Sequence, residues 1–95
     1  MTVVWTTTAQ DHLDSIYAYI ARDSSLYALR MVDRITRRSQ QIADAPLSGR
    51  RVPEYQQEHI RELVEDSYRI IYFVRLEQIE ILAVIHAARN ITDLE

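Results

Sequence analysis

The first half of the chain carries apolar side chains at the three- and four-residue spacing of amphipathic helices. One such stripe consists of Ala9, Leu13, Ile16, Tyr17 and Ile20. Because residues at this spacing lie on one side of a helix, the stripe is predicted to pack against a core. The segment from Thr7 to Gln10 has the spacing of a capping box, which places the start of the helix there.

A second apolar stripe follows after a short break. Asp23, Ser24 or Ser25 can cap this second helix, and Pro46 forbids its continuation. The short connection predicts an antiparallel helical hairpin. The stripe comprises Ala28, Met31, Val32, Ile35 and Ile42.

The second half of the chain changes to strand patterning. Three segments rich in β-branched and aromatic residues are separated by breaks of only a few residues, and a short β-prone segment, Val3–Trp5, stands at the other end of the chain. The middle segment is apolar on both faces in its centre, so it is predicted to be the central strand of the three. The three segments are Ile60–Glu65, Tyr68–Arg75 and Ile79–His86.

Together these elements predict an α+β fold in which an N-terminal strand and a two-helix hairpin accompany a small antiparallel sheet. Tight connections make the late strands antiparallel, and the hairpin is the only cover available for one sheet face. The other face is partly apolar with nothing in the chain to cover it, which predicts a protein-binding surface.

The connection between the helices and the late strands is predicted to be a loop. The segment from Pro46 to Glu54 contains both prolines and Gly49, the only glycine of the chain. No other break divides the chain, so residues 1–95 are expected to form a single domain. The last six residues, 90–95, are expected to be a frayed end.

Composition narrows the chemistry available to this domain. Cysteine is absent, which excludes disulfides, thiolate nucleophiles and the usual zinc ligand sets, and no metal or cofactor site is expected. The net charge is −3, and all 11 basic residues are arginine. Arginine favours planar contacts with carboxylates or phosphates. An acidic protein partner fits this balance, and direct sequence-specific binding of nucleic acid is not expected.

The location of the protein is predicted from what the sequence lacks. No apolar run approaches the ~20 residues that a membrane-spanning helix needs. The N-terminus has no basic stretch followed by an apolar run, as a secretory signal would. We therefore expect a cytoplasmic protein with no membrane partner.

Several segments, in this order and spacing, resemble the RelE/ParE superfamily of small bacterial toxins. They are the strand ending in Trp5, the Ala9-to-Ile20 helix, the Pro46-to-Glu54 loop, Arg61-Glu62-Leu63, Tyr68-Arg69-Ile70-Ile71-Tyr72 and Val84-Ile85-His86-Ala87-Ala88-Arg89. The resemblance implies a two-helix hairpin packed on a small antiparallel sheet, with the N-terminal strand beside the late strands. It also implies a type II toxin–antitoxin system, in which a cognate antitoxin neutralises the toxin by wrapping it.

The superfamily has two functional branches, and the residues favour one of them. RelE-like members are ribosome-dependent mRNA endonucleases, usually basic and rich in lysine. This chain has no lysine, is acidic overall, and has Ala87 where a tyrosine would follow His86. The closing segment from His86 to Arg89 more closely resembles the ParE-like branch, which acts on DNA gyrase and has no firmly established enzymatic site. We therefore predict a gyrase inhibitor that acts by binding.

Two alternative functions are also compatible with the sequence. In the first, the protein is a RelE-like mRNA endonuclease, with Arg61, Arg69 and Arg89 around a phosphate and His86 as general acid or base. The purely structural interpretation is that these arginines pair with neighbouring carboxylates and that His86 closes the sheet through backbone hydrogen bonds. In the second alternative, the chain is an inactive toxin-fold binding module.

Four further arginines lie opposite the apolar stripe of the second helix. This face is a candidate antitoxin-binding site, although any amphipathic helix exposes a charged face to water. The two remaining histidines, His12 and His59, are expected to be ordinary surface residues. The four arginines are Arg30, Arg34, Arg37 and Arg38.

Overall fold

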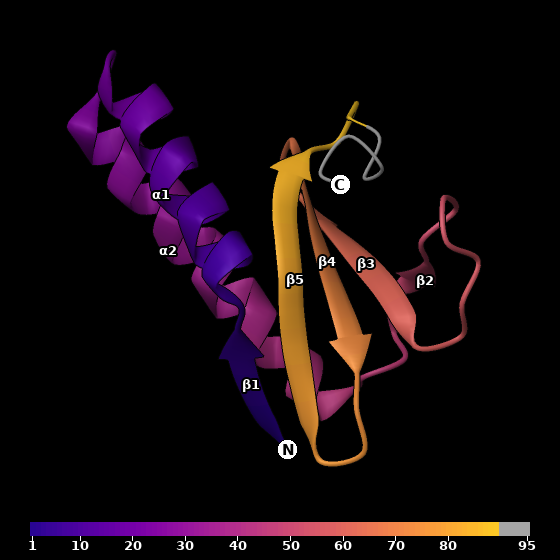
Figure 1. Ribbon diagram of the computed structural model, residues 1–95. Coiled ribbons are helices and arrows are strands. Elements are labelled where there is room, and N and C mark those ends of the chain that lie inside the picture. The colour runs from indigo at the N-terminus through magenta and orange to yellow at the C-terminus, as the bar shows by residue number, and fades with distance from the viewer. Residues whose placement is uncertain (90–95) are drawn as a thin grey trace.

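The structure, a computed structural model, describes residues 1–89; residues 90–95, including the expected frayed end, lie outside the described part. Two helices form a hairpin that lies against one face of a five-stranded sheet (Figure 1). The elements in chain order are β1 (Thr2–Trp5), α1 (Thr7–Ala21), α2 (Ser25–Gln41), the 3₁₀ turn η1 (Ile42–Asp44), β2 (Arg50–Arg51), β3 (Ile60–Glu65), β4 (Tyr68–Val74) and β5 (Gln78–His86).

The sheet confirms the predicted trio of late strands and adds two pairings. The strand order is β1-β5-β4-β3-β2, with β3, β4 and β5 antiparallel and β4 in the middle of the three. The expected sheet was wholly antiparallel, but β1 runs parallel to β5, so the sheet is mixed. Strands that a tight turn joins must run antiparallel, as the late strands do. No tight turn joins β1 to β5, so these two strands can run parallel. The Pro46-to-Glu54 segment contains the two-residue strand β2 and is not entirely loop.

The helix boundaries follow from side-chain caps. Ser24 caps α2 by accepting a hydrogen bond from the Tyr27 N–H at 3.1 Å, as predicted. At α1 the cap is Thr6, one residue before the predicted capping box, and its hydroxyl accepts from the Ala9 N–H at 3.0 Å. The regular helix α2 ends at Gln41, and η1 carries the chain toward Pro46. No helix within residues 1–89 has both the length and the apolar character needed to cross a membrane.

The main core lies between the helical hairpin and the sheet. The predicted stripe of α1 contributes Ala9, Leu13 and Ile16, and α2 contributes Met31 and Ile35. These side chains pack on alternate residues of the central strands, except where a shift in the register of β4 on β5 moves the alternation by one residue between Ile81 and Val84. The strand residues that share this core are Ile70 and Tyr72 of β4 with Ile79, Ile81 and Val84 of β5.

A second, smaller core covers part of the opposite sheet face, and it corrects the expectation of an uncovered face. Val52, directly after β2, is fully buried there against Ile71 and Ile85. Tyr55 packs on the same cluster, so the segment between β2 and β3 folds back over the sheet. The apolar residues of this face are therefore partly covered by the chain itself.

The loop before β2 is held by the hydroxyl of a buried strand residue. Tyr72 donates to the Pro46 carbonyl at 2.8 Å and accepts from the Gly49 N–H at 3.1 Å. A Cβ atom at Gly49 would lie 2.5 Å from the Glu62 carbonyl oxygen and 2.6 Å from the Tyr72 hydroxyl. Only glycine allows this close approach of the loop to β3.

Candidate functional site

The edge of β5 continues beyond the end of β1, and α1 takes over its hydrogen bonding. The Thr6 N–H donates to the Ile81 carbonyl at 3.0 Å, and its hydroxyl lies 3.4 Å from the Leu82 carbonyl. Further along the chain, within α1, the His12 Nδ1 atom accepts from the Val84 N–H at 3.2 Å. Thr6 at the start of α1 and His12 within it thus satisfy a strand edge that would otherwise be open.

His12 is therefore a structural residue, and the expectation of an ordinary surface histidine is wrong. Its ring is partly buried, and accepting at Nδ1 places the proton of the neutral imidazole on Nε2. Burial, and then the nearby Arg89 charge, lower the pKa of His12, while Asp11 opposes the shift. The sequence held a signal for this role, because His12 lies three residues after Ala9 and four before Ile16, beside the apolar stripe.

His86 lies at the end of β5, opposite Tyr68 on β4. The two rings pack edge to face, with centroids 6.1 Å apart and planes at 77°. The His86 Nδ1 atom accepts from the Ala88 N–H at 3.2 Å. His86 is exposed, and its backbone contact uses only the Nδ1 atom. The Nε2 atom is therefore the ring nitrogen that a partner could bind.

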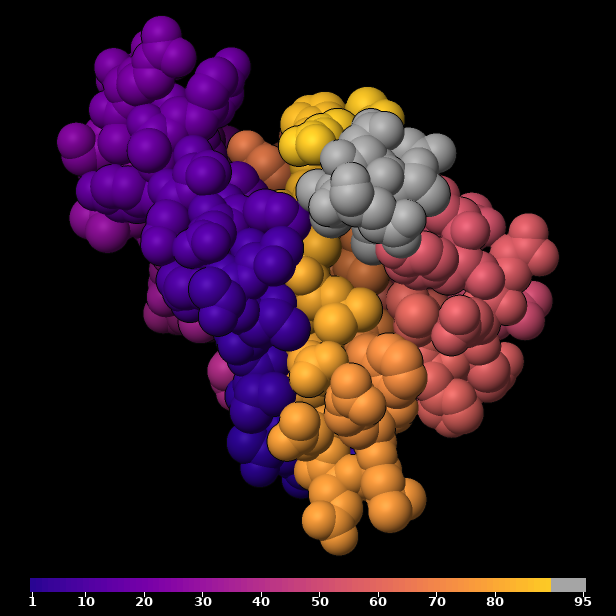
Figure 2. Space-filling view, viewed as in Figure 1, coloured from indigo at the N-terminus to yellow at the C-terminus, as the bar shows by residue number. Residues whose placement is uncertain are grey.

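These residues surround an open groove of about 500 Å³ between α1 and the C-terminal end of β5. Figure 2 shows the surface hollowed between the helical hairpin and this end of the strand. The groove combines an apolar floor with histidine, tyrosine and arginine side chains at its rim. It is lined by His12, Ser15, Ile16, Tyr19, Tyr68, Val84, Ile85, His86 and Arg89.

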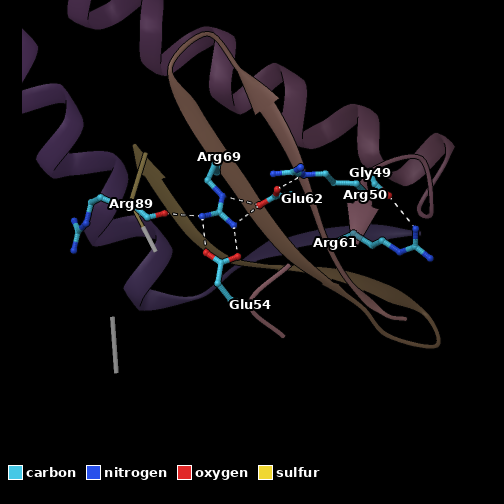
Figure 3. Close-up of polar contacts among 7 residues, drawn as sticks. All are labelled: Gly49, Arg50, Glu54, Arg61, Glu62, Arg69 and Arg89. Carbon is cyan, nitrogen blue, oxygen red and sulfur yellow. Dashed lines mark hydrogen bonds and ion pairs between the residues drawn. The ribbon is translucent and has the colours of Figure 1, made fainter. Parts of the chain in front are cut away.

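The opposite sheet face holds a buried charge network centred on Arg69 (Figure 3). The Arg69 guanidinium binds Glu62 at 2.7 Å and both carboxylate oxygens of Glu54 at 2.8 and 2.9 Å. It also donates to the Arg89 carbonyl at 2.6 Å, and Arg50 pairs with the other side of Glu62. Arg69 is only 4% exposed and Glu62 1%. Every formal charge in this network has an opposite charge beside it, which burial requires.

Arg61 lies away from this network. Its Cα partner is Tyr72, on the helix-facing side of the sheet, whereas Arg69 points to the opposite side. The Arg61 guanidinium donates to the Gly49 carbonyl at 3.0 Å and pairs with Glu58. In Figure 3 the side chains of Arg61 and Arg69 extend to different parts of the fold, and the Arg89 guanidinium points away from both.

Comparison with known proteins identifies the fold just described. The family described as the ParE toxin of the type II toxin–antitoxin system, parDE, matches residues 3–91. The chain belongs to the ParE toxin family. No curated protein matches it.

Two solved structures share this ParE fold. One is a chain of the chromosomal ParDE TA system from P. aeruginosa, 24% identical, with a TM-score of 0.75 over 90% of this chain and 95% of that one. The other is a YoeB/ParE toxin from Agrobacterium tumefaciens, 18% identical, with a TM-score of 0.63 over 90% of this chain and 98% of that one.

Within this ParE fold, the four candidate catalytic residues are divided among three places. His86 and Arg89 meet at the groove, Arg69 lies in the buried network, and Arg61 lies beside the Gly49 loop. The structure therefore does not gather Arg61, Arg69 and Arg89 into one cluster. Glu54, which holds Arg69, and His12 are the residues that sequence reasoning overlooked. Among residues 1–89, no group of three histidine or carboxylate side chains is placed to hold a metal ion.

The arginines of α2 are also used in different ways. Arg34 pairs with Glu65 at 3.0 Å and Asp66 at 3.7 Å, and Arg38 approaches the same Glu65 at 4.0 Å. These two side chains join the helix to the β3–β4 turn. The other two face solvent: Arg37 pairs with Asp33 on its own helix at 3.0 Å, and Arg30 has no ion pair with any of residues 1–89.

Proposed function

We propose that this ParE toxin family member arrests growth by binding DNA gyrase and trapping it with broken DNA, and that a cognate antitoxin holds it inactive in a complex. The observation that carries the choice of binding over RNA cleavage is the separation of Arg61 from Arg69. An RNase site needs several cations around one phosphate. Here the two arginines lie on opposite sheet faces, each occupied by carboxylates.

Exposed apolar side chains support a role in protein binding. The end of the helical hairpin where α1 meets α2 projects beyond the sheet (Figure 1). Tyr19 is 69% exposed there, and Leu26, Tyr27 and Leu29 lie within the first residues of α2 with about half of their surface exposed. Aromatic and leucine side chains gathered at an exposed position favour a protein–protein contact. We assign this end of the hairpin to partner binding.

The antitoxin follows from family membership, and gyrase follows from the ParE branch of the superfamily. Both partners place the protein in the cytoplasm. The acidic net charge of −3 and the absence of lysine agree with recognition of protein surfaces, because proteins that hold nucleic acid by themselves usually carry a positive excess.

Expression in a growing culture tests this function at its first step. Induced expression of the toxin alone should stop growth, and co-expression of the small protein encoded by the adjacent gene should restore it. Cellular mRNA should keep its length during the arrest. Rapid shortening of mRNA would assign the protein to the endonuclease branch, and unchanged growth would identify an inactive binding module.

A further inference from the structure

The groove between α1 and β5 presents hydrogen-bond donors without an acidic group. Within residues 1–89, the nine residues that line the groove include no aspartate or glutamate, although the chain as a whole has a net charge of −3. The charged residue at its rim is Arg89. This local excess of donors contrasts with the buried network on the other sheet face, where carboxylates surround Arg69.

Both histidines of the groove offer their remaining ring nitrogen as a donor. The Nδ1 atoms of His12 and His86 accept backbone N–H groups, from Val84 and Ala88 respectively. A neutral imidazole with Nδ1 as acceptor carries its proton on Nε2. Each ring therefore adds an N–H donor beside Arg89. The Tyr68 hydroxyl is also protonated at neutral pH, and burial raises its pKa further.

Arg89 itself has no counter-ion in the described part of the chain. The ion pairs among residues 1–89 involve seven other arginines and leave Arg89 out. Its backbone carbonyl is fixed by Arg69, which directs its side chain away from the network and toward α1 in Figure 3. The position of Arg89 is thus held by the fold, while its guanidinium has no ion pair within residues 1–89.

The floor of the groove is apolar. Ile16 comes from α1 and Val84 and Ile85 from β5, and each of the three is less than a tenth exposed. A ligand that filled the groove would place an apolar group on this floor and an anionic group at the rim. Apolar pockets with a few converging polar groups are the usual form of a specific binding site.

We propose that this groove binds a segment of the antitoxin in which an apolar side chain stands next to an aspartate or glutamate. The apolar side chain lies on Ile16 and Val84, and the carboxylate meets Arg89. This inference rests on the proposed function, because it assigns a binding site for the partner named there. The groove shares Tyr19 with the exposed end of the hairpin, but the residues that the inference requires, Ile16, Val84 and Arg89, belong neither to that end nor to the arginines of α2.

The test measures the affinity of the purified toxin for the antitoxin encoded by the adjacent gene. Arg89→Glu should weaken binding by about tenfold or more, because a charge pair becomes a repulsion within a partly desolvated groove. Arg51→Glu is the matched control: Arg51 is exposed, has no ion pair within residues 1–89 and lies outside the groove. It should change the affinity less than about twofold, as a solvated charge far from the contact would.

A second pair of variants tests the groove without changing charge. Ser15→Trp fills the groove from α1 and should also weaken binding, whereas Ala18→Trp, on an exposed position of the same helix outside the groove, should not. Thermal unfolding of each variant checks that the fold survives. Exchange of the matching antitoxin carboxylate for arginine should restore binding to Arg89→Glu.

The outcomes separate this inference from the function on which it rests. Wild-type affinity in both Arg89→Glu and Ser15→Trp would overturn the groove and leave the antitoxin in place. Weakened binding that no exchange of an antitoxin carboxylate restores would overturn the assignment of the carboxylate. If the adjacent gene product does not bind the wild-type toxin at all, both proposals fall.

Discussion

Arg69 is the residue whose removal the fold should tolerate least. It is buried between Glu54 and Glu62, and its loss would remove the positive charge that lies between these two carboxylates and leave Glu62 paired with Arg50 alone. Breaking a buried ion pair by removing one partner typically costs about 3–5 kcal/mol. We therefore expect Arg69→Ala to lower the free energy of unfolding in urea by about that amount, a large part of the stability of a 95-residue chain.

Two comparisons give this prediction a control. Arg51→Ala removes an exposed arginine and should change stability by less than about 0.5 kcal/mol. The double variant Arg69→Met, Glu62→Leu removes both members of a buried pair and should be less destabilised than Arg69→Ala. A loss below about 1 kcal/mol in Arg69→Ala would show that the network does not stabilise the fold.

His12 should make the stability depend on pH. Its pKa in the folded protein lies below the ordinary histidine value of about 6.5, chiefly because of burial, so the unfolded chain binds the proton more tightly. The contribution of neutral His12 to the free energy of unfolding is fully present above pH 6.5. It is lost as the pH falls from there through the lowered pKa of the folded protein. Protonation would also remove the acceptor for the Val84 N–H.

Chemical unfolding between pH 7.5 and pH 5.5 measures this dependence. His12→Asn keeps an acceptor near the position of Nδ1 but does not titrate, so its stability should vary less over that range. His59→Asn removes a histidine that makes no such contact with β5 and should keep the slope of the wild type. An equal slope in His12→Asn would contradict the assignment.

The elements themselves were largely predictable, because each depends on local chemistry. The apolar stripes of α1 and α2, the cap at Ser24 and the alternation in β4 all depend on residues close together in the chain. The direction of β1 was not predictable from the sequence. It is set by the packing of β1 against β5, which lies near the opposite end of the chain. The burial of Val52 also escaped prediction: the segment contains both a proline and a two-residue strand, and neither shows where it folds back.

At the level of elements, the solvent-facing side of α2 can be tested separately from its contact with the sheet. Arg34 and Arg38 reach Glu65, so changing them would disturb the packing of α2 against the β3–β4 turn. Arg30 and Arg37 do not touch the sheet. If this face binds an acidic antitoxin segment, Arg30→Glu with Arg37→Glu should weaken the complex several-fold at low salt.

The salt dependence provides the check. Raising the salt concentration screens exposed charges, so the difference between wild type and this double variant should shrink. The double variant Arg51→Glu, Arg75→Glu carries the same change in charge away from α2, in β2 and in the turn after β4, and should bind as the wild type does. Equal affinity of the α2 variant at every salt concentration would leave these arginines as a solvated helix face.

At the scale of the whole molecule, the fold decides which candidate residues can act together. The sequence placed Arg61 and Arg69 eight positions apart in neighbouring strands, and their opposite faces follow from the register of β3 on β4. The groove joins His12 to His86 and Arg89 across more than 70 positions of sequence. These residues are close together because α1 crosses the edge of β5. No local sequence pattern predicts that crossing.

This molecule is proposed to act on gyrase by binding. A supercoiling assay with purified gyrase, relaxed plasmid and ATP tests it most directly, using toxin freed from antitoxin and shown to be folded. We expect loss of supercoiling together with linear, cleaved plasmid, and restoration of supercoiling when the antitoxin is added. Full supercoiling at toxin concentrations well above that of gyrase would contradict it.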